Sequence, residues 1–131
     1  MELSVKTQRR RQIIDLTTEV QTALPPDHTG LAVLTVLHTT AAMTTADLDP
    51  GTDLDLLDAL DTLLPNRTWR HPHNPQHAPD HLLASIVGPS VTVPVQNGQL
   101  VLGTWQRIIM IEFDGPRDRR IRLTLVRSSS P

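Results

Sequence analysis

SVTVPVQNGQLVLGTWQ, residues 90–106, is the stretch that decides the fold class. Its valines at 91, 93 and 95 alternate with other residues, which is typical of a strand with one buried face. Asn97-Gly98 is the strongest two-residue signal for a hairpin turn, and residues 100–102 are expected to return as the second strand. Pro94 indicates an edge position or a bulge, because proline cannot donate a hydrogen bond to a sheet. The stretch therefore predicts an antiparallel hairpin.

The rest of the sequence predicts more strands and a few short helices around this hairpin. The segment Leu31–His38 is apolar on both faces of the pleat, so we expect a central, buried strand that ends on His38. Leucines between 56 and 64 recur at helical spacing behind Asp53, which is a good N-cap residue. The other expected strands are Leu3–Gln8, Gln12–Leu16, Trp105–Phe113 and Ile121–Val126, and the other expected helices span 17–24 and 79–86.

The order of these elements predicts an α+β fold, with a mainly antiparallel sheet or sandwich and two or three short helices. A chain of 131 residues is long enough to bury one hydrophobic core. No internal repeat and no long linker divides it. We therefore expect a single domain over residues 1–131.

Composition argues against several classes of protein. There is no cysteine, so neither a disulfide framework nor a thiolate zinc site can form. The formal net charge is −2, which argues against nucleic-acid binding. No apolar run approaches the roughly 20 residues of a membrane helix, and the N-terminus carries no apolar signal core. We expect a cytoplasmic protein without nucleic-acid or membrane partners.

Histidines supply the first candidates for chemistry, since imidazole binds transition metals and titrates near neutrality. Four of the six lie in one segment, at 71, 73, 77 and 81, with a spacing that matches no standard zinc pattern. That segment is either a solvated loop, the commoner outcome, or a metal or catalytic site. His38 is either a structural histidine bonded to Thr39 or Thr40, or a ligand or acid/base group at the end of the sheet.

Glycines and arginines supply candidates for phosphate binding. Gly103-Thr104 permits either a bulge or the close approach of a ligand, and the following Trp105 either packs, the commoner outcome, or stacks on a substrate. Arg117 and Arg119 follow a turn at 115 and either pair with a phosphate or belong to a solvated charge run. The run Arg9–Arg11 leaves similar alternatives: a solvated turn or subunit contact, which is commoner, or phosphate binding.

Three segments together resemble the YjbQ family of uncharacterised proteins, over roughly Leu31 to Val126. The first is HTTAAMT, residues 38–44, followed by Asp49-Pro50. The second joins WRH at 69–71 to APDHLLAS at 78–85. The third runs from Ser90 through LGTWQ at 102–106 to EFDGPR at 112–117, and it is long and specific.

The resemblance implies an α+β subunit assembled as a homotrimer. It also implies a secondary, weak thiamine-phosphate synthase that acts on phosphorylated small molecules, with a non-catalytic metal- or metabolite-binding homotrimer as the alternative. A third reading is a structural protein whose shared motifs hold the trimer together. The implied catalytic and metal-binding residues are His38, His71 and His81, with a divalent metal, Zn or Mg. The implied phosphate-binding residues are Thr39, Gly103, Thr104, Gln106, Arg117 and Arg119.

The sequence departs from the family pattern in two places. Residues 45–48 stand where the family usually has an Asn-Glu-Asn-like run, and Gln76-His77 stand where it often has Asp-Asn. Both changes remove carboxylate or amide groups. Either His77 replaces a lost ligand, or the site no longer supports the family's chemistry.

Overall fold

The computed structural model describes residues 1–72 and 74–129. One histidine of the predicted cluster, His73, lies outside the described residues. The strands are β1 (Glu2–Lys6), β2 (Gln12–Asp15), β3 (Gly30–Val36), β4 (Ala41–Ala46), β5 (Ser90–Gln96), β6 (Gln99–Leu100), β7 (Arg107–Glu112) and β8 (Asp118–Arg127). The helices are α1 (Thr17–Ala23), α2 (Thr52–Leu63), α3 (Ala78–Val87) and the short 3₁₀ helix η1 (Pro75–His77).

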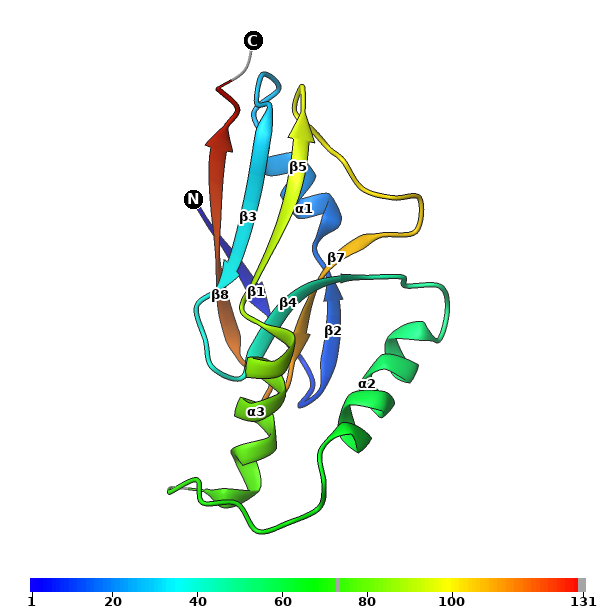
Figure 1. Ribbon diagram of the computed structural model, residues 1–131, viewed down its shortest axis with the longest axis vertical. Helices are drawn as coiled ribbons and strands as arrows, with labels where there is room; N and C mark the ends of the chain where they lie inside the picture. Colours follow the sequence, from blue (N-terminus) through cyan, green and yellow to red (C-terminus); the bar gives the residue numbers. More distant parts are fainter. Residues whose placement is uncertain (73, 130–131) are drawn as a thin grey trace.

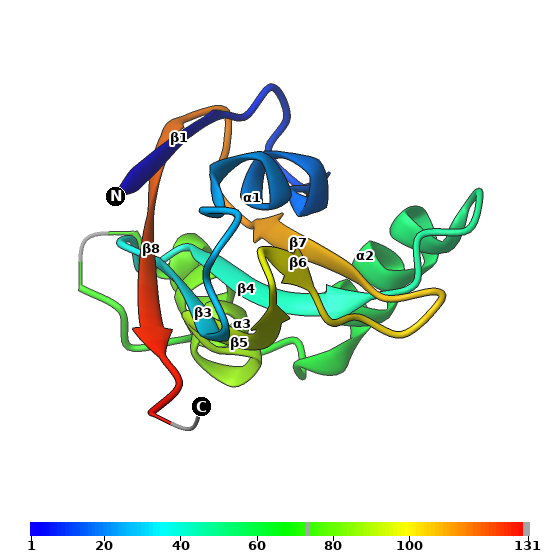
Figure 2. The same cartoon turned by 90° about the horizontal axis from the view of Figure 1, so that it is seen from above.

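Two antiparallel sheets form the body of the molecule (Figure 1). The larger sheet has the strand order β1-β8-β3-β5-β6, and the smaller sheet has the order β2-β7-β4. In Figure 2, α1 and α3 lie on opposite sides of β4 and β7. The predicted α+β class with a mainly antiparallel sheet is confirmed.

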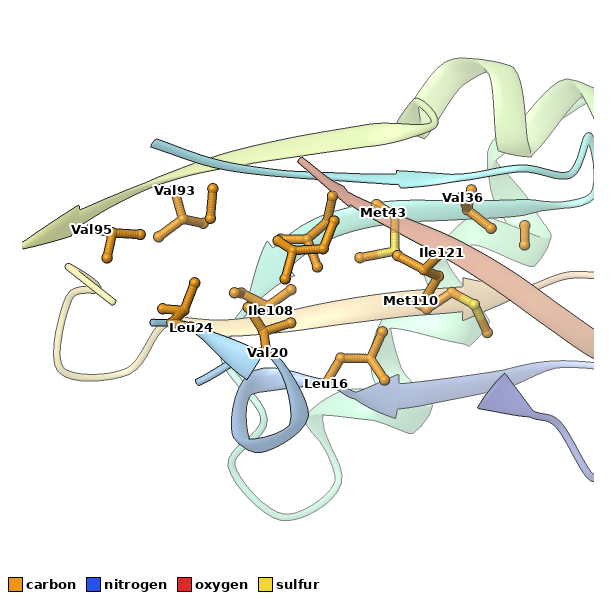
Figure 3. Packing of buried hydrophobic residues seen from close by; sticks show 14 residues of the cluster. Leu16, Val20, Leu24, Val36, Met43, Val93, Val95, Ile108, Met110 and Ile121 are labelled. Atoms are coloured by element: carbon orange, nitrogen blue, oxygen red, sulfur yellow. The ribbon is translucent and has the colours of Figure 1, made fainter. Parts of the chain in front are cut away.

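The first hydrophobic core lies between the two sheets (Figure 3). Along β3, the inward residues Ala32, Leu34 and Val36 are at most 3% exposed. They belong to one cluster with Ile108 and Met110 of β7, which face the same interior. Helix α1 closes this core with Val20 and is followed by Leu24.

The second core lies on the opposite face of β7. Ile109 and Ile111 of that strand belong to one buried cluster with Leu60 of α2 and Leu83 of α3. Strand β7 is therefore buried on both faces, and its last residue, Glu112, is 0% exposed. A carboxylate buried in this way needs a partner, and that requirement shapes the site described below.

The predicted hairpin is confirmed. Strands β5 and β6 pair around Asn97-Gly98, whose φ angles are 49° and 75°. The β5–β6 ladder begins at Val95, so Pro94 has its paired neighbour, Leu31, on the β3 side. Strand β5 is not at the edge of the sheet, since it lies between β3 and β6, and the carbonyl of Pro94 accepts the Val101 N–H at 2.9 Å. The predicted edge position of Pro94 is therefore wrong.

Several predicted strand boundaries are wrong, and one strand was not predicted. Strand β1 ends at Lys6 rather than Gln8, and β3 ends at Val36 rather than His38. Strand β7 begins at Arg107 rather than Trp105, because residues 103–106 form a turn in which Gln106 Oε1 accepts the Gly103 N–H at 2.7 Å. Strand β8 begins at Asp118 rather than Ile121. Strand β4 was not predicted. No helix within residues 1–72 and 74–129 is long and apolar enough to cross a membrane.

Candidate functional site

His38 lies in the loop between β3 and β4, two residues after β3 ends. Two hydrogen bonds tie this loop to β8. The N–H of Leu37 donates to the carbonyl of Arg120 at 3.0 Å. The backbone N–H of Arg120 donates to Nε2 of His38 at 2.9 Å. The imidazole is therefore held by the β8 backbone rather than by the threonines expected as its partners.

The structure places His81 beside His71 and at the same hollows as His38. The ring centroids of His71 and His81 lie 4.7 Å apart, with the planes tilted by 42°. His38 and His81 line the same two hollows in the surface. The three side chains come from separate segments, namely the loop after β3, the loop before η1, and α3 (Figure 1).

The larger of these hollows has a volume of about 720 Å³ and is rich in hydrogen-bond donors. Six of its lining residues carry imidazole, hydroxyl or guanidinium groups: His38, Thr39, Thr40, His81, Arg117 and Arg119. The carboxylates of Asp114 and Asp118 also line it. Arg117 donates from Nη2 to Asp114 Oδ2 at 2.9 Å, and its side chain remains 54% exposed. The hollow can therefore offer several donors to one anion.

Arg119 forms the floor of the hollow and is only 2% exposed. Its Nε donates to Glu112 Oε1 at 2.9 Å, and its Nη2 donates to Thr40 Oγ1 at 2.8 Å and to Glu112 Oε2. Thr7 adds a hydroxyl donor to Glu112 Oε1 at 2.7 Å. The buried carboxylate of β7 is thus neutralised inside the fold. Arg119, which was predicted to bind phosphate, instead donates from Nε and Nη2 to partners within this internal network.

The remaining predicted phosphate ligands lie elsewhere in the chain. Gly103, Thr104 and Gln106 form the turn before β7, whereas the hollow adjoins the far end of that strand. Six strand residues separate the two ends, which corresponds to roughly 17–20 Å. Figure 1 shows the turn at the upper right and α3 at the bottom. One protomer therefore does not bring these three residues to the histidines.

Trp105 in the same turn is 68% exposed. The packing role expected for it is therefore wrong within a single protomer. A smaller hollow beside it is lined by Thr104, Arg107 and the carboxylates of Asp15, Asp47 and Asp49.

An ion-pair cluster beside the site was missed in the sequence. Asp80 of α3 is 0% exposed and accepts hydrogen bonds from Arg10 Nη2 at 3.0 Å and Arg11 Nη2 at 2.9 Å. His77 Nδ1 lies 3.9 Å from Asp80 Oδ2 and 3.6 Å from Asp114 Oδ2. The sequence signal was the Arg9–Arg11 run, whose arginines 10 and 11 are bound to α3 rather than solvated. Because arginines already neutralise both carboxylates, the cluster is better suited to stabilising the fold than to binding a cation.

The charges around the hollow shift three pKa values. Burial raises the pKa of Asp80, and Arg10 and Arg11 offset this only in part. Burial also acts on Asp114, but the hydrogen bond and charge of Arg117 outweigh it, so the pKa of Asp114 falls below its ordinary 3.8. Burial of the ring, together with nearby arginines, lowers the pKa of His38 below 6.5.

The divalent metal implied by the sequence resemblance does not fit all three histidines. A metal ligand must offer an imidazole lone pair. In His38 the Nε2 lone pair accepts the Arg120 N–H, and the other ring nitrogen carries the proton. His71 and His81 remain as a close pair, but two imidazoles alone are fewer than the three or four protein ligands of most zinc sites.

Comparison with known proteins gives consistent matches over nearly the whole chain. A family model described as UPF0047 protein YjbQ-like matches residues 1–128. A UPF0047 protein of Mycobacterium bovis is 44% identical over 128 residues, covering 95% of this chain and 98% of the relative. A UPF0047 protein of Archaeoglobus fulgidus is 41% identical over 122 residues, covering 92% of this chain and 96% of the relative.

Two crystal structures share the fold closely. One is a hypothetical protein from Aeropyrum pernix K1, with a TM-score of 0.89, 37% identity and 98% coverage of both chains. The other is an uncharacterised conserved protein of the YjbQ/UPF0047 family from Clostridium acetobutylicum, with a TM-score of 0.85 and 38% identity. It covers 96% of this chain and 99% of that one. The names of these four proteins state no activity.

Proposed function

The chain belongs to the YjbQ-like UPF0047 family, and on that premise we propose that it is a transferase similar to a thiamine-phosphate synthase. Its substrates would be phosphorylated small molecules bound in the 720 Å³ hollow. The observation that supports this proposal is the set of imidazole, hydroxyl and guanidinium donors that line that hollow. Such donors are the groups that proteins use to bind phosphate.

The proposed reaction joins a pyrimidine that carries a methyl diphosphate to a thiazole phosphate. The carbon–oxygen bond to the diphosphate breaks, and pyrophosphate leaves with the electron pair. The thiazole ring nitrogen uses its lone pair to form the new carbon–nitrogen bond. No proton needs to leave the nucleophile. The catalytic requirement is therefore stabilisation of the negative charge on the leaving pyrophosphate.

Arg117 is the residue best placed for that stabilisation. Its guanidinium is half exposed at the hollow and is held in orientation by Asp114, through the 2.9 Å bond and through Nε, which donates to the Asp114 carbonyl at 2.8 Å. Thr39 and His81 line the same hollow. Arg119 acts from below by fixing Thr40, whose hydroxyl it contacts at 2.8 Å.

The test is release of pyrophosphate from the two substrates, measured with a coupled pyrophosphatase. We expect Arg117→Gln to lower kcat/KM by about a hundredfold, the effect of removing one donor from a developing anion. Arg122→Gln is the matched control, because Arg122 is an exposed arginine of β8 that does not line the hollow. If the folded wild-type protein releases no pyrophosphate above background, the proposed reaction is wrong.

The second candidate is a non-catalytic homotrimer that binds a metal or a metabolite. The close pair of His71 and His81 favours it, because imidazole is a common zinc ligand and further ligands could come from a neighbouring subunit of the trimer. Titration of chelator-treated protein with Zn²⁺ tests this function. A rise in melting temperature with zinc, lost in His71→Ala, and no turnover of the phosphorylated substrates would support it. An unchanged melting temperature would contradict metal binding.

A further inference from the structure

The hydrogen bond to His38 determines the protonation of its ring. A backbone N–H can only donate, so the nitrogen that accepts it must carry a lone pair. The Arg120 N–H lies 2.9 Å from His38 Nε2. Nε2 is therefore unprotonated, and a neutral imidazole must then carry its proton on Nδ1. A doubly protonated ring would place an N–H against the N–H of Arg120.

We propose that His38 is a neutral hydrogen-bond donor that binds a phosphate oxygen through Nδ1–H, rather than a metal ligand or a general base. The inference rests on the proposed function, because it assigns a role within the same hollow. No described residue accepts a hydrogen bond from Nδ1 of His38 within the chain. The ring lines the hollow, so an anion bound there is the available acceptor.

The surroundings of the ring favour the neutral form. Arg119, Arg120 and Arg117 all act on His38 as positive charges, and Glu112 opposes them. Together with burial, these charges lower the pKa of His38 below its ordinary 6.5. A neutral donor beside several guanidinium groups adds a hydrogen bond to an anion without adding repulsion among the cations.

The proton on Nδ1 also favours a phosphate over a metal ion as the group bound beside His38. A metal at Nδ1 would require the single ring proton to move to Nε2, where it would oppose the Arg120 N–H. A phosphate oxygen requires no such rearrangement. The geometry points to an anion with oxygens within reach of His38, the hydroxyl of Thr39 and Arg117, all of which line the hollow.

Two substitutions separate the two roles of the ring, which are to accept a hydrogen bond at Nε2 and to donate one from Nδ1. The amide of asparagine places an N–H near the position of Nδ1, whereas the amide of glutamine places an oxygen near the position of Nε2. We expect His38→Gln to keep the melting temperature close to wild type but to weaken pyrophosphate binding about ten- to hundredfold, the loss of one hydrogen bond to a charged group. His38→Asn should lower the melting temperature and keep most of the pyrophosphate affinity.

Isothermal titration with pyrophosphate measures the affinities, and Zn²⁺ is titrated separately. Equal loss of pyrophosphate affinity in both variants would overturn the donor role, as would tight zinc binding that both variants abolish. If Arg117→Gln weakens pyrophosphate binding and His38→Gln does not, the inference is wrong while the proposed site stands. If the wild-type protein binds no pyrophosphate, both are wrong.

Nitrogen NMR gives a direct reading of the tautomer. In ¹⁵N-labelled protein with pyrophosphate, we expect the His38 ring to show a protonated Nδ1 and an unprotonated Nε2, with the signal identified by its loss in His38→Gln. A proton on Nε2, or on both nitrogens, in the folded protein would contradict the proposal. This measurement does not depend on any enzymatic activity.

Discussion

The buried pair of Arg119 and Glu112 shows how a single residue couples stability to the site. Arg119 is 2% exposed and Glu112 is 0% exposed, and both oxygens of the carboxylate accept from the guanidinium. Removing one member of such a pair leaves the other charge buried without a partner. The pair therefore holds β7 to β8 while it orients Thr40 at the floor of the hollow.

We expect Arg119→Met to lower the free energy of unfolding by roughly 3–5 kcal/mol, measured by urea denaturation. The matched control is Arg120→Met, the next residue of β8, whose side chain is 60% exposed and should change stability by less than about 0.5 kcal/mol. The double variant Arg119→Met with Glu112→Leu should recover part of the loss. Equal stability of Arg119→Met and Arg120→Met would refute the assignment.

Asp15 provides a test by pH. Burial opposes its ionisation, but hydrogen bonds from Thr17 and the 2.8 Å pair with Arg107 outweigh it, so the pKa of Asp15 lies below its ordinary 3.8. A depressed folded-state pKa stabilises the protein above the unfolded value and loses this effect as pH falls through the folded value. Relative to wild type, Asp15→Asn should lower the melting temperature near neutral pH, and the difference should shrink below about pH 3.8. A difference that stays constant down to about pH 2 would contradict this account.

At this scale, the buried role of Arg119 could not be predicted from the sequence. Inward positions of β8 alternate as Arg119, Ile121 and Leu123. The predicted strand began at Ile121, because Arg119 was interpreted as a phosphate ligand or as part of a solvated charge run after the turn at 115. The partner that makes the charge acceptable, Glu112, lies on another strand. Strand periodicity can therefore locate Arg119, but the sequence does not show which residue neutralises it.

Among the elements, the β5–β6 hairpin depends on Gly98 for two separate reasons. Its φ angle is 75°, and a Cβ there would lie 2.8 Å from the carbonyl oxygen of Pro25. Gly51 before α2 also has a positive φ, 90°, but a Cβ there would meet nothing within 4 Å. A comparison of the two glycines therefore distinguishes the effect of backbone strain from the effect of steric overlap.

We expect Gly51→Ala to cost roughly 1–2 kcal/mol, the penalty of the left-handed region for a residue with a Cβ. Gly98→Ala should cost at least about 1 kcal/mol more, because the methyl group must also displace the Pro25 backbone. Chemical denaturation of both variants measures the difference. Equal destabilisation would show that the hairpin yields to the methyl group without strain on the loop after α1.

Elements with a strong hydrophobic period or turn signal were predictable, and β4 was not. Its residues 41–46 are alanine, methionine and threonine, which carry no clear period-two pattern. The small Ala42 lies in one buried cluster with Ala84 of α3, so its size serves close packing of helix on strand. The requirement for a small residue at 42 comes from a contact between distant segments. No local pattern in the sequence could therefore predict β4 from it.

At the scale of the whole molecule, the candidate site is assembled from distant parts of the chain. His38 follows β3, His81 lies on α3, and Arg117 lies in the turn between β7 and β8. Spacing along the sequence could not show that these residues meet, whereas the resemblance to a family could nominate them. The turn at 103–106 lies apart from these residues, so the phosphate-binding role predicted for Gly103, Thr104 and Gln106 is not supported within the chain.

The predicted homotrimer would need two different contact surfaces on each subunit, because a closed trimer joins unlike patches of neighbouring subunits. One candidate is the turn that carries Trp105, which is 68% exposed. Another is the row formed by Leu31 and Val126, paired across β3 and β8 and exposed by 39% and 47%. Exposed apolar side chains grouped in this way are typical of contact surfaces.

We expect the wild-type protein to have the mass of a trimer by light scattering, and Trp105→Ala to shift it to smaller species at micromolar concentration. A tryptophan at the centre of an interface commonly contributes at least about 2 kcal/mol to association. The fold of each protomer should survive, since the side chain is mostly exposed, and circular dichroism checks this. Leu54→Ala, at a residue 56% exposed on α2, is the control and should leave the mass unchanged. A trimer that persists in Trp105→Ala would place the interface elsewhere, and a monomeric wild-type protein would exclude the trimer and leave Trp105 free for a substrate.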